Sequence, residues 1–381
     1  MLKQQCQIVT VYLSAIFLLA PSFLLPSGFT DLADDPSDEY DDAYMGFDGL
    51  VAYQTEESGE QTKAHEAELD KLVFNSPSRP IAKNGWNLWV RGDALYWRAS
   101  EDNLFYAYSG NDIGGSRNRD VLTVDFDWDW GFRLGIGYTI PRDKWDICLY
   151  WTRFHTSSHS SFSANLPKEN IFINWWEINF LGNVGITTSG SGHWKADLDQ
   201  LDLSLGREFF VGRRLTVRPH AGVRSSWIDQ HLTCAFQATP GSAVTRMKND
   251  FWGLGFFAGL DTRWLLSNSW HIFANGDLAL LYGNFDILEK GKVNGTLNFS
   301  YDESFHAGRA VADLQAGLCW SHSFCKDRFA LSLRAGYEYH LYPNQNQLPL
   351  DVGNDGFLTT LNAVDGDLAY QGLFLSGQWD F

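Results

Sequence analysis

The chain has 381 residues, 44% of them hydrophobic and 15% aromatic, with 35 glycines and a formal net charge of −17. The acidic balance argues against a nucleic-acid partner, which needs a basic surface. Beyond about residue 30, no apolar run is long enough to cross a membrane as a helix. The body of the chain is therefore either soluble or crosses a membrane as strands.

The first 28 residues have the pattern of a cleaved secretory signal peptide. Lys3 precedes an apolar run from Ile8 to Ala20, and small residues follow this run. Pro21 and Pro26 interrupt the region, whereas a membrane anchor needs about twenty predominantly apolar residues. We predict that residues 1–28 are an export signal, with an anchored helix as the alternative.

Residues 29–83 form an acidic, polar segment. Within it, residues 31–70 contain fourteen acids and a single base, Lys63, so most of the net negative charge of the chain lies here. Prolines at positions 36, 77 and 80 and a low apolar content predict a flexible segment. For an exported chain, we expect this segment in the periplasm.

From residue 84 to residue 381, the sequence alternates apolar and polar residues with the period of a strand. Most of the alternating segments exceed the usual five or six residues of a globular strand, and a tilted membrane strand needs about nine to eleven residues. The aromatic and glycine content is typical of a membrane barrel. The predicted strands are 86–98, 121–140, 145–158, 192–207, 214–230, 247–266, 270–285, 305–322, 328–342 and 367–381.

The connections between these segments alternate between short and long. Four are short: 141–144, 208–213, 267–269 and 323–327. Five are long: 99–120, 159–191, 231–246, 286–304 and 343–366. This alternation predicts an all-β fold, a transmembrane antiparallel up-and-down β-barrel with short periplasmic turns and long extracellular loops. We expect ten strands, or twelve if a hairpin near Leu104–Tyr108 or Val293–Phe299 joins the wall, and closure because lipid offers no partner to an open edge.

The two faces of the predicted strands differ in chemistry. In 328–342, Leu331 and Leu333 lie on one face, whereas Arg334 and Glu338 lie on the other. We assign the apolar face to lipid, because an arginine there at mid-depth costs about 2–4 kcal/mol. The charges predicted to face the lumen are Arg91, Asp93, Arg133, Asp146, Asp202, Arg218, Arg224, Asp261, Arg263, Asp277, Arg309, Asp313, Arg334 and Glu338. They fit two roles, an ion-coordinating pore wall and a charge network that fills a narrow barrel.

The C-terminal strand ends with Trp379 and Phe381 on its apolar face. A terminal Phe on an alternating strand resembles the signal read by the outer-membrane assembly machinery. We therefore expect the chain in the bacterial outer membrane, with lipid and this machinery as partners.

Several segments resemble the pore-forming major outer membrane proteins of Legionella and chlamydia-related bacteria. The resemblance covers about residues 84–381, without the acidic segment, and lies mainly in Trp89–Trp97, Trp130–Tyr138, Lys144–Phe154, Arg218–Gln230, Phe251–Trp264, Leu280–Phe285, Ala335–Tyr339 and Asn344–Leu348. It implies a porin-like surface protein that passes small solutes and in some members forms homo-oligomers. It supplies no catalytic residues. Typical aqueous porins have about sixteen strands, so ten to twelve strands imply a narrower pore.

Two other functions remain open from the sequence. The long aromatic loop 159–191 suits a structural or adhesive surface barrel, because exposed apolar loops mark interaction sites. Histidines and acids near the external rim suit a hydrolase: His155, His159, His193, Asp197, Asp199, Asp229 and His231. We expect no enzyme, since no protease or phospholipase motif accompanies these residues. The cysteine spacing fits no metal site, and we expect no cofactor.

Overall fold

The computed structural model describes residues 86–113, 116–140, 144–164, 170–173, 187–211, 214–239, 241–325, 328–351, 361–363 and 365–381. The predicted signal peptide and acidic segment lie outside these residues. They stay predictions.

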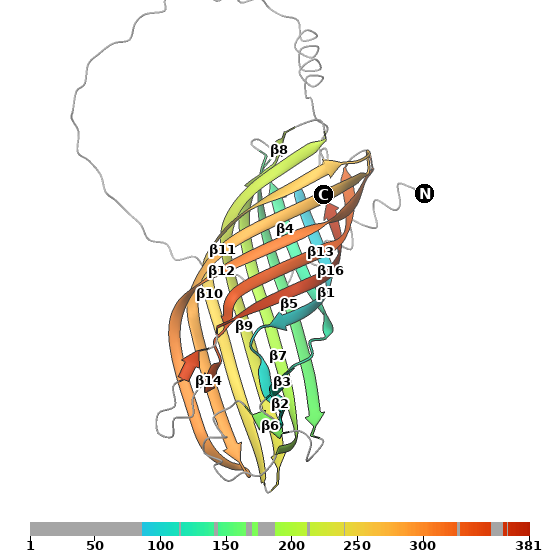
Figure 1. The fold of residues 1–381 in the computed structure, drawn as a ribbon. Helices are drawn as coiled ribbons and strands as arrows, with labels where there is room; N and C mark the ends of the chain where they lie inside the picture. Colours follow the sequence, from blue (N-terminus) through green and yellow to red (C-terminus); the bar gives the residue numbers. More distant parts are fainter. Residues whose placement is uncertain are drawn as a thin grey trace, which may run out of the picture. The chain divides into compact units, whose positions relative to one another are not determined.

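Ten long strands form one closed antiparallel barrel, as the alternating segments predicted (Figure 1). Each strand pairs with its neighbour along the chain, β9 pairs with β10, and β16 pairs with β1 to close the ring. The wall strands are β1 (Leu88–Glu101), β4 (Trp128–Thr139), β5 (Trp145–Ser163), β7 (Thr187–Arg207), β9 (Leu215–Ala238), β10 (Gly241–Leu265), β11 (Trp270–Val293), β12 (Thr296–Phe324), β13 (Phe329–Asn346) and β16 (Gly366–Asp380).

One end of the barrel, here called the turn end, carries the short connections and the start of β1. The backbone N–H of Phe381 donates to the carbonyl of Leu88 at 2.8 Å, so the two ends of the wall meet there. The two-residue strand β8 (Phe209–Phe210) pairs with β9 at the same end. The strands on either side of each predicted short connection end or begin here: β4 and β5, β7 and β9, β10 and β11, and β12 and β13.

At the opposite end, here called the loop end, two of the predicted long loops are largely strand. The β9–β10 pair continues to the connection after Ala238, and the β11–β12 pair continues to Asn294 and Gly295. Asn294 and Gly295 have φ of 48° and 81°, the left-handed pair that a two-residue type I′ hairpin requires. Residues 231–246 and 286–304 therefore form long hairpins that continue the barrel wall.

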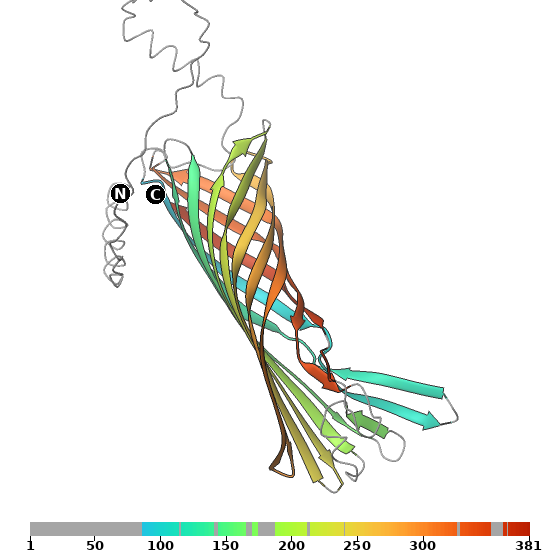
Figure 2. The same ribbon diagram turned by 90° about the vertical axis from the view of Figure 1, so that its left-hand side faces the viewer.

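The remaining strands form two small sheets outside the wall ladder. β2 (Phe105–Ile113), β3 (Ser116–Thr123) and β6 (Asn170–Ile173) form a three-stranded sheet, and β14 (Pro349–Asp351) pairs with β15 (Leu361–Ala363). Figure 2 shows the β2–β3 hairpin standing out from the side of the barrel near the loop end. Phe105–Tyr108 lies in β2 of the separate sheet, and Val293–Phe299 is the tip of the β11–β12 hairpin. Neither adds a further pair of strands, so the wall has ten strands.

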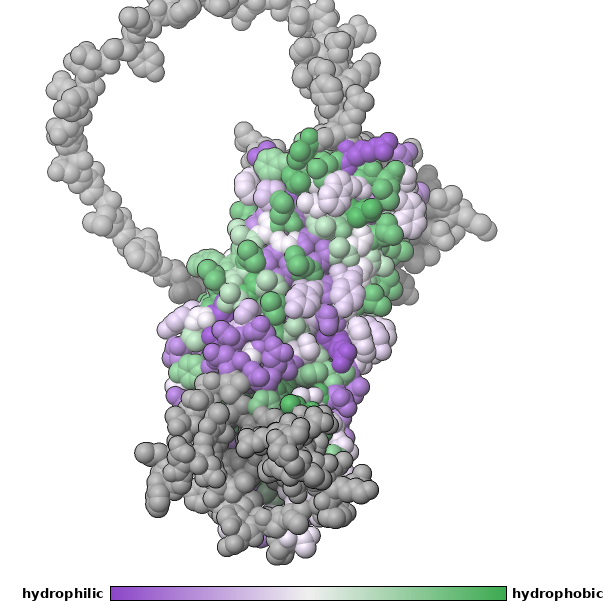
Figure 3. All heavy atoms as spheres, in the orientation of Figure 1, coloured by the Kyte–Doolittle hydropathy of each residue, from purple (hydrophilic) through white to green (hydrophobic). Residues whose placement is uncertain are grey.

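An apolar band surrounds the outside of the barrel between two rows of aromatic residues. On β10, the outward side chains run from Trp252 through Leu254, Phe256 and Leu260 to Trp264, all more than 40% exposed. Twelve residue steps on a strand tilted by about 45° cover about 28 Å of membrane thickness, which matches the lipid core. Figure 3 shows green and pale side chains over this part of the wall. The outward face therefore has the depth and chemistry of a lipid contact.

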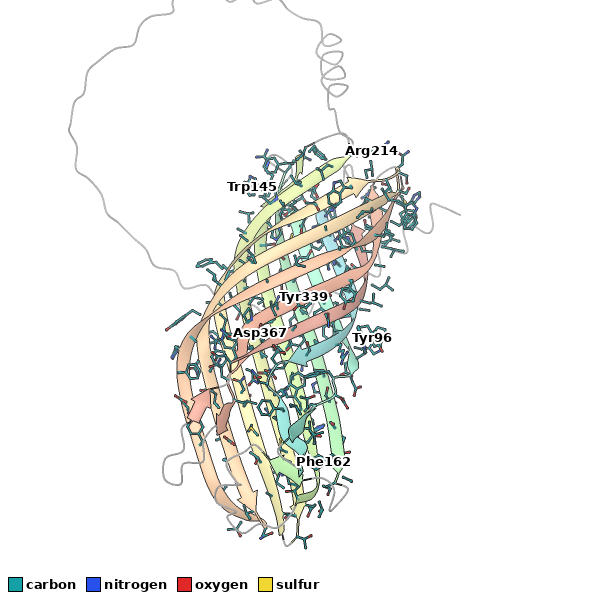
Figure 4. The ribbon with its side chains drawn as sticks, in the orientation of Figure 1. Tyr96, Trp145, Phe162, Arg214, Tyr339 and Asp367 are labelled. Carbon is teal, nitrogen blue, oxygen red and sulfur yellow. The ribbon has the colours of Figure 1, made fainter. Side chains whose placement is uncertain are left out.

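The two rows also appear on other strands. Figure 4 labels Trp145 near the turn end and Tyr96 further along the wall, with Phe162 toward the loop end. Tyr96 stacks with Trp128 and packs at a tilt against Trp130, at ring-centroid distances of 5.3 and 4.8 Å. None of the described residues forms a helix that is long and apolar enough to cross a membrane.

Candidate functional site in the barrel lumen

The first cluster of lumen charges joins β1, β4 and β13. Arg91 Nε donates to Asp93 Oδ1 at 2.7 Å, and Arg133 Nη1 lies 3.3 Å from Asp93 Oδ2 and 3.1 Å from Glu338 Oε2. Trp97 Nε1 donates to Glu338 Oε1 at 2.9 Å. The pairing therefore joins adjacent strands β1 and β4 and also reaches across β16 to β13, and it satisfies both carboxylates.

The second cluster centres on Arg224, which is 2% exposed. Its Nε donates to Asp202 Oδ1 at 2.7 Å, and its Nη1 donates to Asp313 Oδ2 at 2.5 Å. His340 Nδ1 lies 2.8 Å from the other oxygen of Asp313. Because Asp202 lies on β7 and Asp313 on β12, Arg224 connects distant parts of the wall through the lumen.

A third cluster lies nearer the turn end. Arg218 forms a two-pronged ion pair with Asp146 and also donates to Asp261 Oδ2 at 2.9 Å. His220 Nε2 lies 2.8 Å from Asp277 Oδ1. Arg263 Nη1 donates to Glu208 Oε1 at 2.9 Å. We call these three clusters together the charged belt.

The charged belt surrounds a cavity of about 140 Å³. Twelve of the fourteen predicted lumen charges line this cavity: Arg91, Arg133, Asp146, Asp202, Arg218, Arg224, Asp261, Arg263, Asp277, Asp313, Arg334 and Glu338. Asp93 lies next to it and binds Arg91 and Arg133. Arg309 lies apart, with its guanidinium carbon 4.5 Å from the centre of the Phe285 ring. Among the described residues, no carboxylate forms an ion pair with Arg309 or Arg334.

Uncharged and histidine side chains also belong to this site. His220, His340, Gln315 and Gln378 line the cavity, and their inward positions follow from the same period of two. Glu208 was assigned to a turn, yet it is the partner of Arg263. Glu208 lies just after the end of β7, where the alternation of the strand no longer predicts which side chains face inward.

Inward-facing glycines make room for the large side chains of the lumen. A Cβ on Gly206 would lie 2.6 Å from the guanidinium carbon of Arg218, and a Cβ on Gly137 would lie 2.3 Å from the Trp89 ring. At Gly222, a Cβ would lie 2.0 Å from the carbonyl oxygen of Leu203. These glycines therefore allow neighbouring side chains and backbone to lie close to the wall, as expected for glycine in a barrel strand.

Toward the loop end, the lumen is filled by aromatic side chains that are less than 2% exposed. We call them the aromatic layer: Trp97, Phe154, Trp194, Phe251, Phe285, Tyr342 and Tyr370. Trp97 packs on Phe154 at 5.3 Å and on His340 at 4.8 Å between ring centroids, so this layer rests directly on the charged belt. Side-chain packing therefore closes the lumen above the cavity.

A buried polar chain lies beside the aromatic layer. Gln230 Nε2 donates to Glu101 Oε1 at 2.6 Å, and Asn249 Nδ2 donates to Gln230 Oε1 and to the carbonyl of Gln345, both at 2.8 Å. On β1 the outward residues after Tyr96 are Arg98 and Ser100, so Glu101 lies beyond the lipid band. Burial raises the pKa of Glu101 to about 8.

The candidate hydrolase residues lie on the outer surface and do not share a pocket with the lumen charges. His155 Nδ1 lies 2.5 Å from Asp197 Oδ1, and both side chains are at least half exposed. Asp197, Asp229 and Asp250 occupy paired positions on β7, β9 and β10. Burial and the neighbouring carboxylates raise the pKa of Asp229. Most of the aromatic stretch 159–191 lies outside the described residues.

The C-terminal strand lies between β13 and β1. Trp379 stacks near Phe324 and Phe329 at ring-centroid distances of 6.2 and 6.3 Å, and Phe381 packs against Phe329 at 6.4 Å. Recognition of these residues by the assembly machinery stays a prediction.

A closed ten-stranded ladder, a lipid-facing apolar band and a charged lumen define a β-barrel of the bacterial outer membrane. A family model described as the Legionella pneumophila major outer membrane protein precursor matches residues 78–381. The chain belongs to this family and is an outer-membrane protein, as the sequence resemblance predicted. A search of curated proteins finds no match.

Three solved structures illustrate what this chain is similar to. A FadL homologue from Pseudomonas aeruginosa is 13% identical, with 81% of this chain and 95% of that chain covered and a TM-score of 0.28. The outer membrane protease OmpT from Escherichia coli is 8% identical, with 80% and 100% covered and a TM-score of 0.41. The translocator domain of the autotransporter NalP from Neisseria meningitidis is 12% identical, with 84% and 95% covered and a TM-score of 0.30. Because these scores are low, the fold assignment rests on the strand ladder of this chain.

Proposed function

We propose that the chain forms a narrow, charge-lined pore for small ions and solutes. The observation that carries this proposal is the charged belt around a polar cavity of about 140 Å³ within the membrane part of the barrel. A wall that only had to fill the lumen could use apolar side chains, which need no partners. The lumen instead places arginines and carboxylates side by side, and such side chains tune ion selectivity where a lumen conducts.

The barrel size sets an upper limit on what passes. Ten strands enclose far less space than the sixteen to eighteen strands of aqueous porins. The aromatic layer also closes the lumen toward the loop end. Conduction therefore requires a shift of these aromatic side chains, and it gives small conductance steps.

Single-channel conductance of the refolded barrel in planar bilayers tests this proposal. We expect small, stable steps, and Arg218→Gln should shift the reversal potential in a salt gradient toward cation selectivity, because the lumen loses a positive charge. Arg153→Gln is the matched control: Arg153 lies on the outward face, with a 55% exposed side chain 3.8 Å from Asp199. A barrel that shows the heat-dependent gel mobility of a folded protein but never conducts would overturn the proposal.

A silent, folded barrel would favour the second candidate, a structural or adhesive surface protein. The observation behind this candidate is the closed aromatic layer, in which Trp97, Tyr342 and Tyr370 are at most 1% exposed. The hairpins β9–β10 and β11–β12 would then be the functional parts, as rigid extensions of the wall.

A further inference from the structure

Arg334 differs from the other arginines that line the cavity. It is 7% exposed, and its buried Nε has no hydrogen-bond partner. Arg334 Nη2 donates to Gln378 Oε1 at 3.3 Å. Among the described residues no carboxylate forms an ion pair with it, whereas Arg91, Arg133, Arg218, Arg224 and Arg263 each have one.

Two further guanidinium groups lie on the same part of the cavity wall. Arg91 Nε donates to Ser376 Oγ at 2.9 Å, and Ser376 is the residue directly opposite Arg334 in the β13–β16 ladder. Arg263 is directly opposite Phe273 in the β10–β11 ladder, and the Arg334 guanidinium carbon lies 5.9 Å from the centre of the Phe273 ring. Arg91 and Arg263 therefore flank Arg334 from two sides.

The nearby carboxylates do not neutralise this third cation. Asp93 binds Arg91 and Arg133, and Glu208 binds Arg263. An arginine cannot release its proton in a protein, and a buried charge without a partner is strongly unfavourable. A positive charge at this place needs a negative partner that the wall does not provide.

We propose that the cavity binds a small inorganic oxyanion of the phosphate type at Arg334, with Arg91 and Arg263 adding positive potential. The guanidinium fork matches the oxygen spacing of such an anion, and the free Nε supplies a donor. The cavity is large enough for several water molecules or one such anion with water. The site does not depend on whether the lumen conducts, because binding needs access from one end only.

Titration calorimetry with inorganic phosphate at constant ionic strength tests the site, with gluconate as the background anion. The protein is the one purified from outer membranes of cells that express the full chain. We expect one saturable site, and Arg334→Gln should weaken phosphate binding by about ten-fold or more through loss of a charge-assisted hydrogen bond. Arg309→Gln should bind phosphate like the unchanged protein, because Arg309 is a second lumen arginine without an acidic partner but lies outside the cavity.

Absence of saturable binding by the unchanged protein would overturn the proposal, as would equal affinities of the Arg334 and Arg309 variants. If the Arg334 variant fails to fold, crystals of the unchanged protein soaked in selenate provide a second measurement. An anomalous peak within hydrogen-bond distance of the Arg334 guanidinium supports the site, and its absence contradicts it.

Discussion

The two halves of the lumen are built on the same inward positions but with opposite chemistry. Toward the turn end, inward residues such as Arg91 and Asp146 are charged and lie in pairs. Toward the loop end, inward residues such as Trp97 and Phe251 are aromatic and pack without space between them. The strand period therefore fixes which side chains enter the lumen. The residue type decides whether these side chains interact through ion pairs or through aromatic packing.

The two halves should also differ in how substitutions change the stability of the barrel. Removing one member of a buried ion pair is strongly destabilising, since the other charge stays buried without a partner. An aromatic contact loses free energy in proportion to the atoms removed. We therefore expect the charged half to respond most strongly to the loss of single charges, and the aromatic half to respond gradually to size.

The largest effect is expected at Arg224 in the charged belt. Arg224→Leu leaves Asp202 and Asp313 without their shared guanidinium, at former distances of 2.7 and 2.5 Å. We expect a loss of about 3–5 kcal/mol in the free energy of unfolding. Urea unfolding in lipid vesicles, followed by tryptophan fluorescence, measures it.

Arg153→Leu is the control for the charged belt, because this arginine forms an exposed pair with Asp199 on the outward face. Its loss should change the free energy of unfolding by less than about 1 kcal/mol. Equal effects of the two arginine variants would contradict a structural role for the buried network.

A smaller, pH-dependent effect is expected at Glu101 beside the aromatic layer. Its pKa is raised from 4.5 to about 8 in the folded protein by burial, so the folded state holds a proton that the unfolded state releases. Stability should therefore fall as pH rises from about 4.5 to about 8 and then level off, by a few kcal/mol in total.

Glu101→Gln keeps an oxygen that accepts the hydrogen bond from Gln230 but cannot ionise. The variant should lose this part of the pH dependence and be more stable than the unchanged protein at pH 9. Urea unfolding at several pH values provides the comparison, and parallel pH profiles for the two proteins would refute the assignment.

The smallest effect is expected from a change of size in the aromatic layer. Phe251→Leu removes part of a ring that lies 4.6 Å from the Phe285 ring, and we expect a loss of about 1–2 kcal/mol. Phe256→Leu on the same strand is the control, because Phe256 points outward and is 76% exposed. If both variants lose the same stability, inward packing is not what distinguishes the two positions.

The wall of the barrel could be predicted from the sequence because lipid and lumen impose opposite chemistry on alternate residues. Leu333 and Arg334 have the environments that this rule assigns, and burial alternates in the same way along β13 from Ala330 to Glu338. The rule fails beyond the lipid band, where both faces of a strand can be polar. On β9 and β10, outward residues of segment 231–246 such as His231 and Arg246 are polar or charged, so this part of the two strands resembled a loop.

The division of the lumen into two halves could not be predicted in the same way. Trp97 and Arg91 share an inward face, and nothing in the period of two separates a packed layer from a charged one. The pairings themselves also depend on distances across the lumen, such as that between Arg224 and Asp313, residues 89 positions apart in the chain. The sequence pattern places these charges on one face of each strand, whereas the pairs that join distant strands depend on the fold.

The continuous pairing of β11 with β12 up to Asn294 and Gly295 has a consequence for survival at the cell surface. Secreted proteases bind their substrates as single extended segments, and exposed loop tips are their preferred sites of cleavage. The backbone groups of this hairpin are already paired, and its tip is only two residues long. It therefore contains almost no unpaired extended segment that a protease could bind. Limited digestion of whole cells should therefore spare this hairpin and cut first at connections that lack such pairing.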